Sequence, residues 1–284
     1  MSTVHALHPF LYDRTVRRAL AEDLGRAGDI TTDAIVPAEA VATAAIAARE
    51  TGRVAGLDVA LHAFRLLDDG VTAEVRLPDG SDVPAGAVLA RVRSRARALL
   101  TGERAALNLL GHLSGVATAT RVVVARLEGL HTRVVCTRKT TPGLRALEKY
   151  AVRVGGGSNH RYGLDDGILI KDNHVALAGG LTEAVARARR GVGHMMKIEV
   201  EVDTLAQLDE ALFLGVDAVL FDNMDVPTLR EAVRRAKGRV LTEASGGVRP
   251  DHVREVAETG VDLVSLGWLT HSAPALDVAL DVEG

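Results

Sequence analysis

Cysteine is almost absent from this chain of 284 residues: Cys136 is the only one, so no internal disulfide can form. A reducing compartment is the simplest interpretation of that composition. A basic excess is also absent, because the formal net charge is −3 and the pI is about 6.4, and this argues against a nucleic-acid-binding protein. No apolar run approaches the roughly 20 residues that a membrane span needs, and the N-terminus does not resemble a signal peptide. We therefore expect a soluble, cytoplasmic protein without nucleic-acid or membrane partners.

The composition is otherwise typical of a globular protein, with 47% hydrophobic and 25% charged residues. The length allows one large domain or two modest ones. In the first part of the chain, residues 9–24 and 55–67 indicate helices. Three strand-like runs are separated by turn residues, as in an antiparallel sheet: 41–49, 71–77 and 88–92. This part therefore predicts an α+β arrangement.

Further along the chain, helices and strands alternate. Residues 103–110 and the apolar segment after them indicate a helix. The predicted strands that follow are 133–137, 167–171, 196–202, 218–222, 240–243 and 263–266. The predicted helices between them are 143–152, 182–190, 204–214, 226–237 and 250–259. Repeated strand–helix units require a parallel sheet, because each strand must return by a crossover.

Polar residues and a glycine lie at or just past the C-terminal ends of these predicted strands. They are Lys139, Lys171, Glu201, Asp222, Ser245 and Gly267. In a barrel of the TIM type all of these ends meet at one mouth, where such enzymes carry their chemistry. In an open, doubly wound sheet they would concentrate at a single switch point instead. Their distribution over all the strands favours the barrel.

Basic side chains and histidines gather in residues 137–174, although the whole chain has a net charge of −3. They are Arg138, Lys139, His160, Arg161, Lys171 and His174. Most of them lie next to glycines, turns or strand ends rather than along a helix, and this placement predicts a pocket for a multiply charged anion. Taken singly, each has a structural alternative: a solvated loop, a lysine that extends to water, or a histidine bonded to backbone.

Carboxylates form the acidic counterpart of this predicted pocket. In the alternating run IEVEVD, Glu199 and Glu201 would point to the same side of the sheet. If that side is the barrel interior, Glu201 reaches the mouth and Glu199 lies one layer deeper. Asp222 ends the apolar strand AVLFD. Strand-end carboxylates suit sugar hydroxyls and a hard divalent cation, and the structural alternative is that they neutralise a buried lysine.

Small-residue loops follow the last two predicted strands. They contain Ser245, Gly246 and Gly247 after the first of these strands, and Ser265 and Gly267 after the second. Backbone amides of glycine loops at this position favour phosphate in barrels, whereas either loop alone would be an ordinary turn. In the first part of the chain, Arg104 lies near the start of a predicted helix. From sequence chemistry alone it is a surface cation in an exposed ion pair.

Eight segments of the chain, in order, resemble the quinolinate phosphoribosyltransferases, also called carboxylating nicotinate-nucleotide pyrophosphorylases. They are EDLGRAGDITTD, ERAALNLLGHLSGVATAT, TRKTTPGLRALEKYAV, GGGSNHRYGLDDGILIKDNH, EVEVD, LFDN, EASGG and GWLTHS. The resemblance implies an N-terminal α/β sandwich over residues 1–110, completed by the tail 275–284, and an incomplete TIM-like α/β barrel over residues 111–274. It also implies a homodimer in which each active site borrows from the partner's N-terminal domain.

The resemblance further implies a reaction. Quinolinate and phosphoribosyl pyrophosphate would give nicotinate mononucleotide, carbon dioxide and pyrophosphate in NAD biosynthesis, with Mg²⁺ as cofactor. By matching segments, Arg138, His160 and Arg161 would bind the two quinolinate carboxylates. Lys139 and Lys171 would line the same pocket and contact substrate or pyrophosphate.

The remaining assignments concern the sugar phosphate and the partner subunit. Glu201 and Asp222 resemble the carboxylates that serve the ribose hydroxyls and magnesium, and the two small-residue loops would hold the 5-phosphate. Arg104 would reach across from the neighbouring subunit, which replaces the surface role that its sequence chemistry suggests.

Three alternatives stay open at the level of sequence. A relative associated with molybdenum transport would use the same scaffold for another substrate. A phosphosugar isomerase or lyase on an ordinary barrel would explain the small-residue loops but neither the basic pairs nor Arg104. A non-enzymatic anion-binding module would need the basic pocket but not Glu201 and Asp222.

Overall fold

The computed structural model of the protein describes residues 4–283, which form two compact units. The first unit contains the chain up to Arg121, the segment Thr140–Gly156 and the chain from Leu269 onward. The second contains Val122–Lys139 and Gly157–Trp268. None of the helices among the described residues combines the length and the hydrophobicity that a membrane span requires.

The first unit is built on an antiparallel sheet with the strand order β12-β1-β5-β3. Its strands are β1 (Val41–Ala48), β3 (Thr72–Val75), β5 (Val88–Arg95) and β12 (Val278–Glu283). A short antiparallel ribbon joins β2 (Gly52–Arg53) to β4 (Asp82–Val83). The three strands predicted for this part of the chain are confirmed, and the C-terminal β12 pairs with β1 along the register Thr43–Glu283 to Ala48–Val278.

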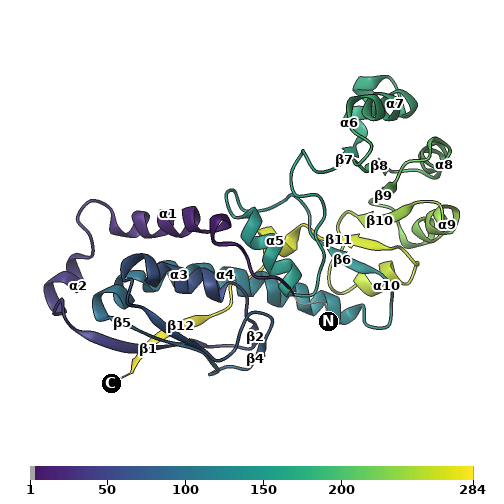
Figure 1. The fold of residues 1–284 in the computed structure, drawn as a ribbon. Helices are drawn as coiled ribbons and strands as arrows, with labels where there is room; N and C mark the ends of the chain where they lie inside the picture. The colour runs from purple at the N-terminus through teal and green to yellow at the C-terminus, as the bar shows by residue number, and fades with distance from the viewer. Residues whose placement is uncertain (1–3, 284) are drawn as a thin grey trace. The chain divides into compact units, whose positions relative to one another are not determined.

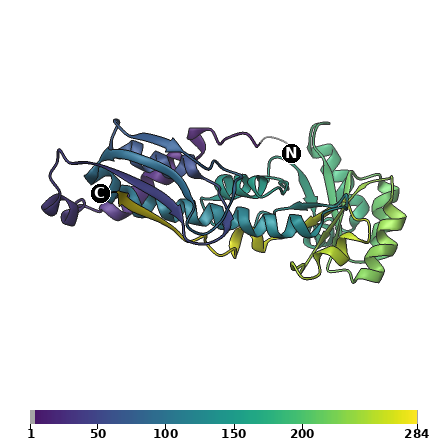
Figure 2. The same ribbon diagram turned by 90° about the horizontal axis from the view of Figure 1, so that it is seen from below.

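Helices lie against this sheet, as Figure 1 shows for α3 and α4, and the view from below in Figure 2 has the strands in front of them. The helices of the unit are η1 (Pro9–Leu11), α1 (Asp13–Leu24), α2 (Ile30–Ile35), α3 (Leu57–Leu67), α5 (Arg145–Val154) and most of α4 (Ala96–Arg126), which ends in the second unit. The helix predicted at 9–24 is thus divided into η1 and α1, and the one at 103–110 is part of the longer α4. Glycines let α4 approach the C-terminal tail: a Cβ on Gly115 would lie 2.0 Å from the Pro274 carbonyl oxygen.

The second unit is an incomplete α/β barrel, which confirms the predicted fold class. Its strands are β6 (Arg133–Val135), β7 (Ile168–Ile170), β8 (Ile198–Val202), β9 (Ala218–Asp222), β10 (Leu241–Ser245) and β11 (Leu263–Ser265). All five pairings between them are parallel, in the order β6-β11-β10-β9-β8-β7. Within the described residues no strand pairing joins β6 to β7, so the sheet does not close there.

Helices connect the strands of the second unit and cover the outside of the sheet in sequence order (Figure 1). They are α6 (Asp172–Ala178), α7 (Leu181–Gly191), α8 (Leu205–Leu214), α9 (Val226–Ala236) and α10 (Val253–Ala257), and α11 (Trp268–His271) begins at the unit's end. Local chemistry sets their limits. Thr204 caps α8 by accepting a hydrogen bond from the Gln207 N–H, and Gly215 ends that helix in the left-handed conformation. Asp225 caps α9 in the same way.

Candidate active site

The C-terminal ends of the parallel strands bring the predicted carboxylates together. Glu201 of β8 is in register with Leu220 of β9, which is in register with Glu243 of β10. Residues in register on parallel strands point to the same face, so these three positions form one layer of the barrel interior. Asp222 lies one layer higher, in register with Ser245. Burial alternates along β8, as expected for a strand with carboxylates on one face.

Lys171 and Glu201 form the ion pair nearest the mouth of the barrel. The Lys171 Nζ lies 2.5 Å from a Glu201 carboxylate oxygen, and the side chains are 46% and 12% exposed. Lys171 also begins α6, where its backbone N–H donates to His174 Nδ1 at 3.0 Å. His174 is therefore bonded to backbone, which is the structural alternative named for it above. The pairing joins the ends of the neighbouring strands β7 and β8.

His160 enters the site because the chain after the triple glycine runs beside β6. Ser158 forms a parallel bridge with Val135, and its N–H donates to the Val134 carbonyl at 2.8 Å. The Cys136 N–H in turn donates to the Ser158 carbonyl at 3.2 Å. This short extension of the sheet directs the next residues, His160 and Arg161, toward the barrel.

Both ring nitrogens of His160 have partners within the chain. Nε2 lies 3.0 Å from a Glu199 carboxylate oxygen and 3.6 Å from one of Glu243. Nδ1 accepts a hydrogen bond of 2.7 Å from the backbone N–H of Arg161. An acceptor Nδ1 leaves the ring proton on Nε2, which faces the two carboxylates. Along β8, Glu199 lies on the same face as Glu201 and one layer deeper, as predicted from the alternation of the strand.

Glu243 is a site residue that sequence reasoning missed. The residue is 1% exposed, and one carboxylate oxygen has no hydrogen-bond partner. Burial, followed by the nearby charge of Glu199, raises the pKa of Glu243 to about 7, and His160 opposes this rise. The available signal was a carboxylate inside the otherwise uncharged strand run LTEAS, the same kind of signal that identified Asp222.

Arg138 and Arg161 carry guanidinium groups whose positive charges interact. Burial, followed by the positive charge of Arg138, lowers the pKa of Arg161, and Glu199 is the first of the charges that oppose this change. The Arg161 guanidinium donates to the Gly167 carbonyl at 3.0 Å. Two cations at short range repel each other, and an anion between them relieves that repulsion. The arrangement is suited to a ligand with more than one negative charge.

Lys139 and Arg104 are both exposed. The Lys139 backbone N–H donates to Thr137 Oγ1 at 3.0 Å in the turn after β6. Arg104 lies in the first unit, on α4, where its side chain is 66% exposed and its guanidinium is 3.7 Å from the Glu103 carboxylate. That contact matches the exposed ion pair expected from sequence chemistry.

Glycine is required in the loop after β10. Gly246 has φ +96°, and a Cβ at this position would lie 2.1 Å from the Asn223 side-chain oxygen and 2.9 Å from the Asn223 nitrogen. Asn223 itself has φ +53°, and its side-chain amide donates to the Asp222 carboxylate at 2.8 Å. Backbone of two neighbouring loops therefore comes close here, at a place where no side chain fits.

A cavity of about 250 Å³ opens beside this loop on the helix side of the sheet, and Ser245, Gly246 and Gly247 line it together with Phe221 of β9 and side chains of α9 and α10. Ser265, at the end of the neighbouring strand β11, is buried, and Gly267 is the second residue after it. The predicted phosphate loops thus follow β10 and β11, at the same ends of the sheet as the carboxylates. Small residues beside a cavity allow backbone N–H groups to approach an anion.

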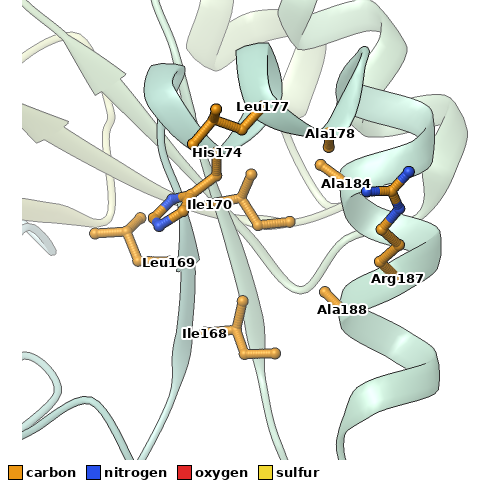
Figure 3. A pocket seen from close by; sticks show the side chains of 9 residues that line it. All are labelled: Ile168, Leu169, Ile170, His174, Leu177, Ala178, Ala184, Arg187 and Ala188. Carbon is orange, nitrogen blue, oxygen red and sulfur yellow. The ribbon is translucent and has the colours of Figure 1, made fainter.

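A second cavity, of about 340 Å³, lies against β7, α6 and α7 (Figure 3). Aliphatic side chains line most of it, and His174 and Arg187 are its titratable residues. Ile168 and Ile170 contribute from β7, on the opposite face of that strand from Leu169. Most of this cavity therefore faces the helices rather than the barrel interior.

Two groups of residues could hold a metal ion. Among the described residues, His160, Glu199 and Glu243 bring three ligand atoms within 4.8 Å of one another. The Nε2 atom of His160 faces both carboxylates of this group, at 3.0 Å from Glu199 and 3.6 Å from Glu243. Glu201 and Asp222, at the ends of adjacent strands, instead offer hard carboxylate oxygens of the type that Mg²⁺ prefers. The Glu201 carboxylate also forms the ion pair with Lys171.

Comparison with known proteins places this architecture and site in one family. Residues 29–114 match the profile of the quinolinate phosphoribosyl transferase N-terminal domain, and residues 116–281 match that of its C-terminal domain. The chain is 48% identical over 276 residues to the nicotinate-nucleotide pyrophosphorylase [carboxylating] of Mycobacterium leprae, covering 94% of this chain and 96% of that protein. It is 46% identical over 261 residues to a protein of Bacillus subtilis described as a probable enzyme of the same name, covering 92% and 90%.

Solved structures agree with the sequence comparison. The nicotinate-nucleotide pyrophosphorylase of Francisella tularensis is 36% identical, covers 100% of both chains and superimposes with a TM-score of 0.94. An enzyme of Ehrlichia chaffeensis with the same name is 39% identical, covers 96% of this chain and 98% of that one, and gives a TM-score of 0.91. Both family profiles, the curated relatives and the structures converge, and the chain belongs to the quinolinate phosphoribosyltransferase family.

Proposed function

We propose that this protein transfers the phosphoribosyl group of phosphoribosyl pyrophosphate to quinolinate, forming nicotinate mononucleotide, carbon dioxide and pyrophosphate in NAD biosynthesis. The observation that carries the proposal is the pair of neighbouring guanidinium groups, Arg138 and Arg161, beside a barrel mouth that also carries carboxylates and a glycine loop. Membership in the family supports it, since the relatives from Mycobacterium leprae and Bacillus subtilis carry the corresponding enzyme name.

The two substrates are both strongly anionic, and the cations of the mouth divide between them. Arg138 and Arg161, with His160 beside them, bind the two carboxylates of quinolinate. Lys139 and Lys171 line the same pocket and contact quinolinate or the departing pyrophosphate. Bidentate guanidinium–carboxylate pairs fix the plane and the position of the pyridine ring, so its nitrogen is aimed at the sugar.

The carboxylates and the small-residue loops serve the sugar phosphate. Glu201 and Asp222 accept hydrogen bonds from the ribose hydroxyls and would hold Mg²⁺, directly or through water. The loops that contain Ser245 and Ser265 bind the 5-phosphate through backbone N–H groups. Mg²⁺, when bound, supplies positive charge that stabilises the departing pyrophosphate.

Bond making begins at the pyridine nitrogen, which attacks the anomeric carbon as the bond to pyrophosphate breaks. Positive charge that develops on the ribose is stabilised by the negative charges of Glu201 and Asp222. The alkylated nitrogen is cationic, so it accepts the electron pair left on the adjacent ring carbon when carbon dioxide leaves. That carbon then takes up a proton from water. The residues of the chain position and neutralise the reactants, and no redox cofactor is involved.

The working assembly in this proposal is a cytoplasmic homodimer. Arg104, which is 66% exposed on the first unit, would complete the partner's active site. A third cation donated in this way would add to the charge that Arg138 and Arg161 present to quinolinate.

An assay of purified protein with quinolinate, phosphoribosyl pyrophosphate and Mg²⁺ tests the proposed reaction. We expect nicotinate mononucleotide, carbon dioxide and pyrophosphate to appear in equal amounts, and chelation of Mg²⁺ to stop the reaction reversibly. Nicotinate should replace quinolinate poorly, because it lacks the second carboxylate. Folded protein that forms no nicotinate mononucleotide under these conditions would refute the proposal.

A further inference from the structure

His160 lies beside the predicted quinolinate pocket, yet its polar atoms are directed into the protein. Nε2 points to Glu199 at 3.0 Å and to Glu243 at 3.6 Å, and Nδ1 accepts from the Arg161 N–H at 2.7 Å. The side chain is 14% exposed. A ligand that approached this ring would therefore meet carbon atoms, unless one of the internal hydrogen bonds were broken first.

The two carboxylates both contact the ring at Nε2. Glu199 and Glu243 come from β8 and β10, which are separated by β9 in the sheet, and the ring reaches both of them. The side chains of Glu199 and Glu243 are 12% and 2% exposed. Turning the His160 ring away from them would leave buried polar groups without a partner, which is unfavourable. Both carboxyl groups face the same nitrogen, Nε2, so the ring orientation is set from two strands at once.

Arg161 is fixed at both of its ends. Its backbone N–H is held by the His160 ring at 2.7 Å, and its guanidinium donates to the Gly167 carbonyl at 3.0 Å. Glu199 also supplies negative charge that favours the charged form of this guanidinium against the positive charge of Arg138. The same carboxylate therefore orients the ring and offsets the clustered cations.

From these contacts we infer that His160 is a positioning residue: Glu199 and Glu243 orient its ring, and the ring fixes the backbone, and thereby the guanidinium, of Arg161. The inference rests on the proposed function only in naming quinolinate as the ligand of Arg161. It assigns to Glu243 a role in quinolinate affinity, although Glu243 itself does not touch the substrate.

The tautomer of His160 is the direct test, because it can be measured without any substrate. In protein with ¹⁵N-labelled histidine, two-bond ¹H–¹⁵N correlations distinguish the two neutral tautomers and the imidazolium ion. His160→Gln identifies the signal by its loss. We expect the Nε2–H tautomer at neutral pH, unchanged after quinolinate is added. An Nδ1–H tautomer, an imidazolium ion, or a change of protonated nitrogen on quinolinate binding would each overturn the inference.

A pair of Glu243 variants supplies an independent test. Glu243→Gln keeps a neutral hydrogen-bonding group of the same shape, whereas Glu243→Leu removes it. By calorimetry, we expect Glu243→Leu to weaken quinolinate binding about tenfold, because the ring loses a contact that orients it and the Arg161 guanidinium is then held less firmly in place. Phosphoribosyl pyrophosphate should bind both variants nearly as well as the wild type. Glu231→Leu, at an exposed ion pair on α9, is the matched control and should leave both affinities unchanged.

The outcomes separate this inference from the proposed function. Wild-type protein that does not bind quinolinate contradicts the proposed function, while the tautomer still decides the role of His160. Quinolinate binding that is equal in Glu243→Gln and Glu243→Leu, or equal loss of both substrates in Glu243→Leu, overturns the positioning role alone.

Discussion

Replacement of Arg161 by alanine is expected to weaken quinolinate binding by roughly 10- to 150-fold, because a charge-assisted hydrogen bond contributes about 1.5–3 kcal/mol. The affinity for phosphoribosyl pyrophosphate should change little, since the carboxylates and loops that serve it lie on β8 to β11. Titration of each substrate into the variant by calorimetry measures the two effects separately.

Arg234→Ala is the matched control for this substitution. Arg234 is also an arginine of the second unit, but its side chain is 72% exposed and is paired with Glu231 on the outer helix α9. Its loss should leave both affinities at the wild-type value. If Arg161→Ala weakened the binding of both substrates equally, Arg161 would support the fold of the site rather than bind a quinolinate carboxylate.

Mixing two inactive variants is expected to restore activity if Arg104 completes the partner's active site. A heterodimer of an Arg104→Ala subunit and a Lys171→Ala subunit carries both changes in one site and neither in the other. One intact site should then give about half of the wild-type activity per dimer. Neither variant alone should show that activity, because every site in each homodimer lacks one of the two cations.

Tagged subunits allow the heterodimer to be isolated and its composition verified before the assay. A second mixture, of Arg161→Ala and Lys171→Ala subunits, is the control, because both residues belong to the second unit of the same chain. Both sites of that heterodimer stay defective, so its activity should remain low. Absence of recovery in verified Arg104/Lys171 heterodimers would contradict the shared site.

The sequence predicted the features of the site that depend on strand periodicity. Alternation in IEVEVD placed Glu199 and Glu201 on one face, and the structure pairs them with His160 and Lys171 on the interior of the barrel. Asp222 was identified because a carboxylate at the end of an apolar strand is unusual. The prediction for Glu199 and Glu201 is confirmed because the period of a strand fixes the direction of its side chains.

Other features depend on contacts between distant segments and could not be predicted in the same way. The raised pKa of Glu243 comes first from burial and then from the charge of Glu199, and both of these arise only in the folded sheet. The full length of α4 was equally hidden, because the glycines within it resemble helix breakers. Gly115 is instead required by the close approach of Pro274, which lies far along the chain.

From the sequence, His160 is expected to bind the anion directly. Its neighbour Arg161 and the preceding glycines indicate an anion pocket, and a histidine there is naturally taken for a ligand of the anion. The structure adds three internal partners for the ring, which come from β8, from β10 and from the backbone of the next residue. Nothing in the local sequence NHR distinguishes a ring that faces a ligand from one that faces the protein.

A crystal structure of the protein with quinolinate tests the central claim most directly. We predict that the two carboxylates of one quinolinate molecule contact Arg138 and Arg161 at the C-terminal ends of the barrel strands, with the ring nitrogen facing the side of Glu201 and Asp222. Quinolinate bound elsewhere, or with its ring nitrogen turned away from those carboxylates, would contradict the account.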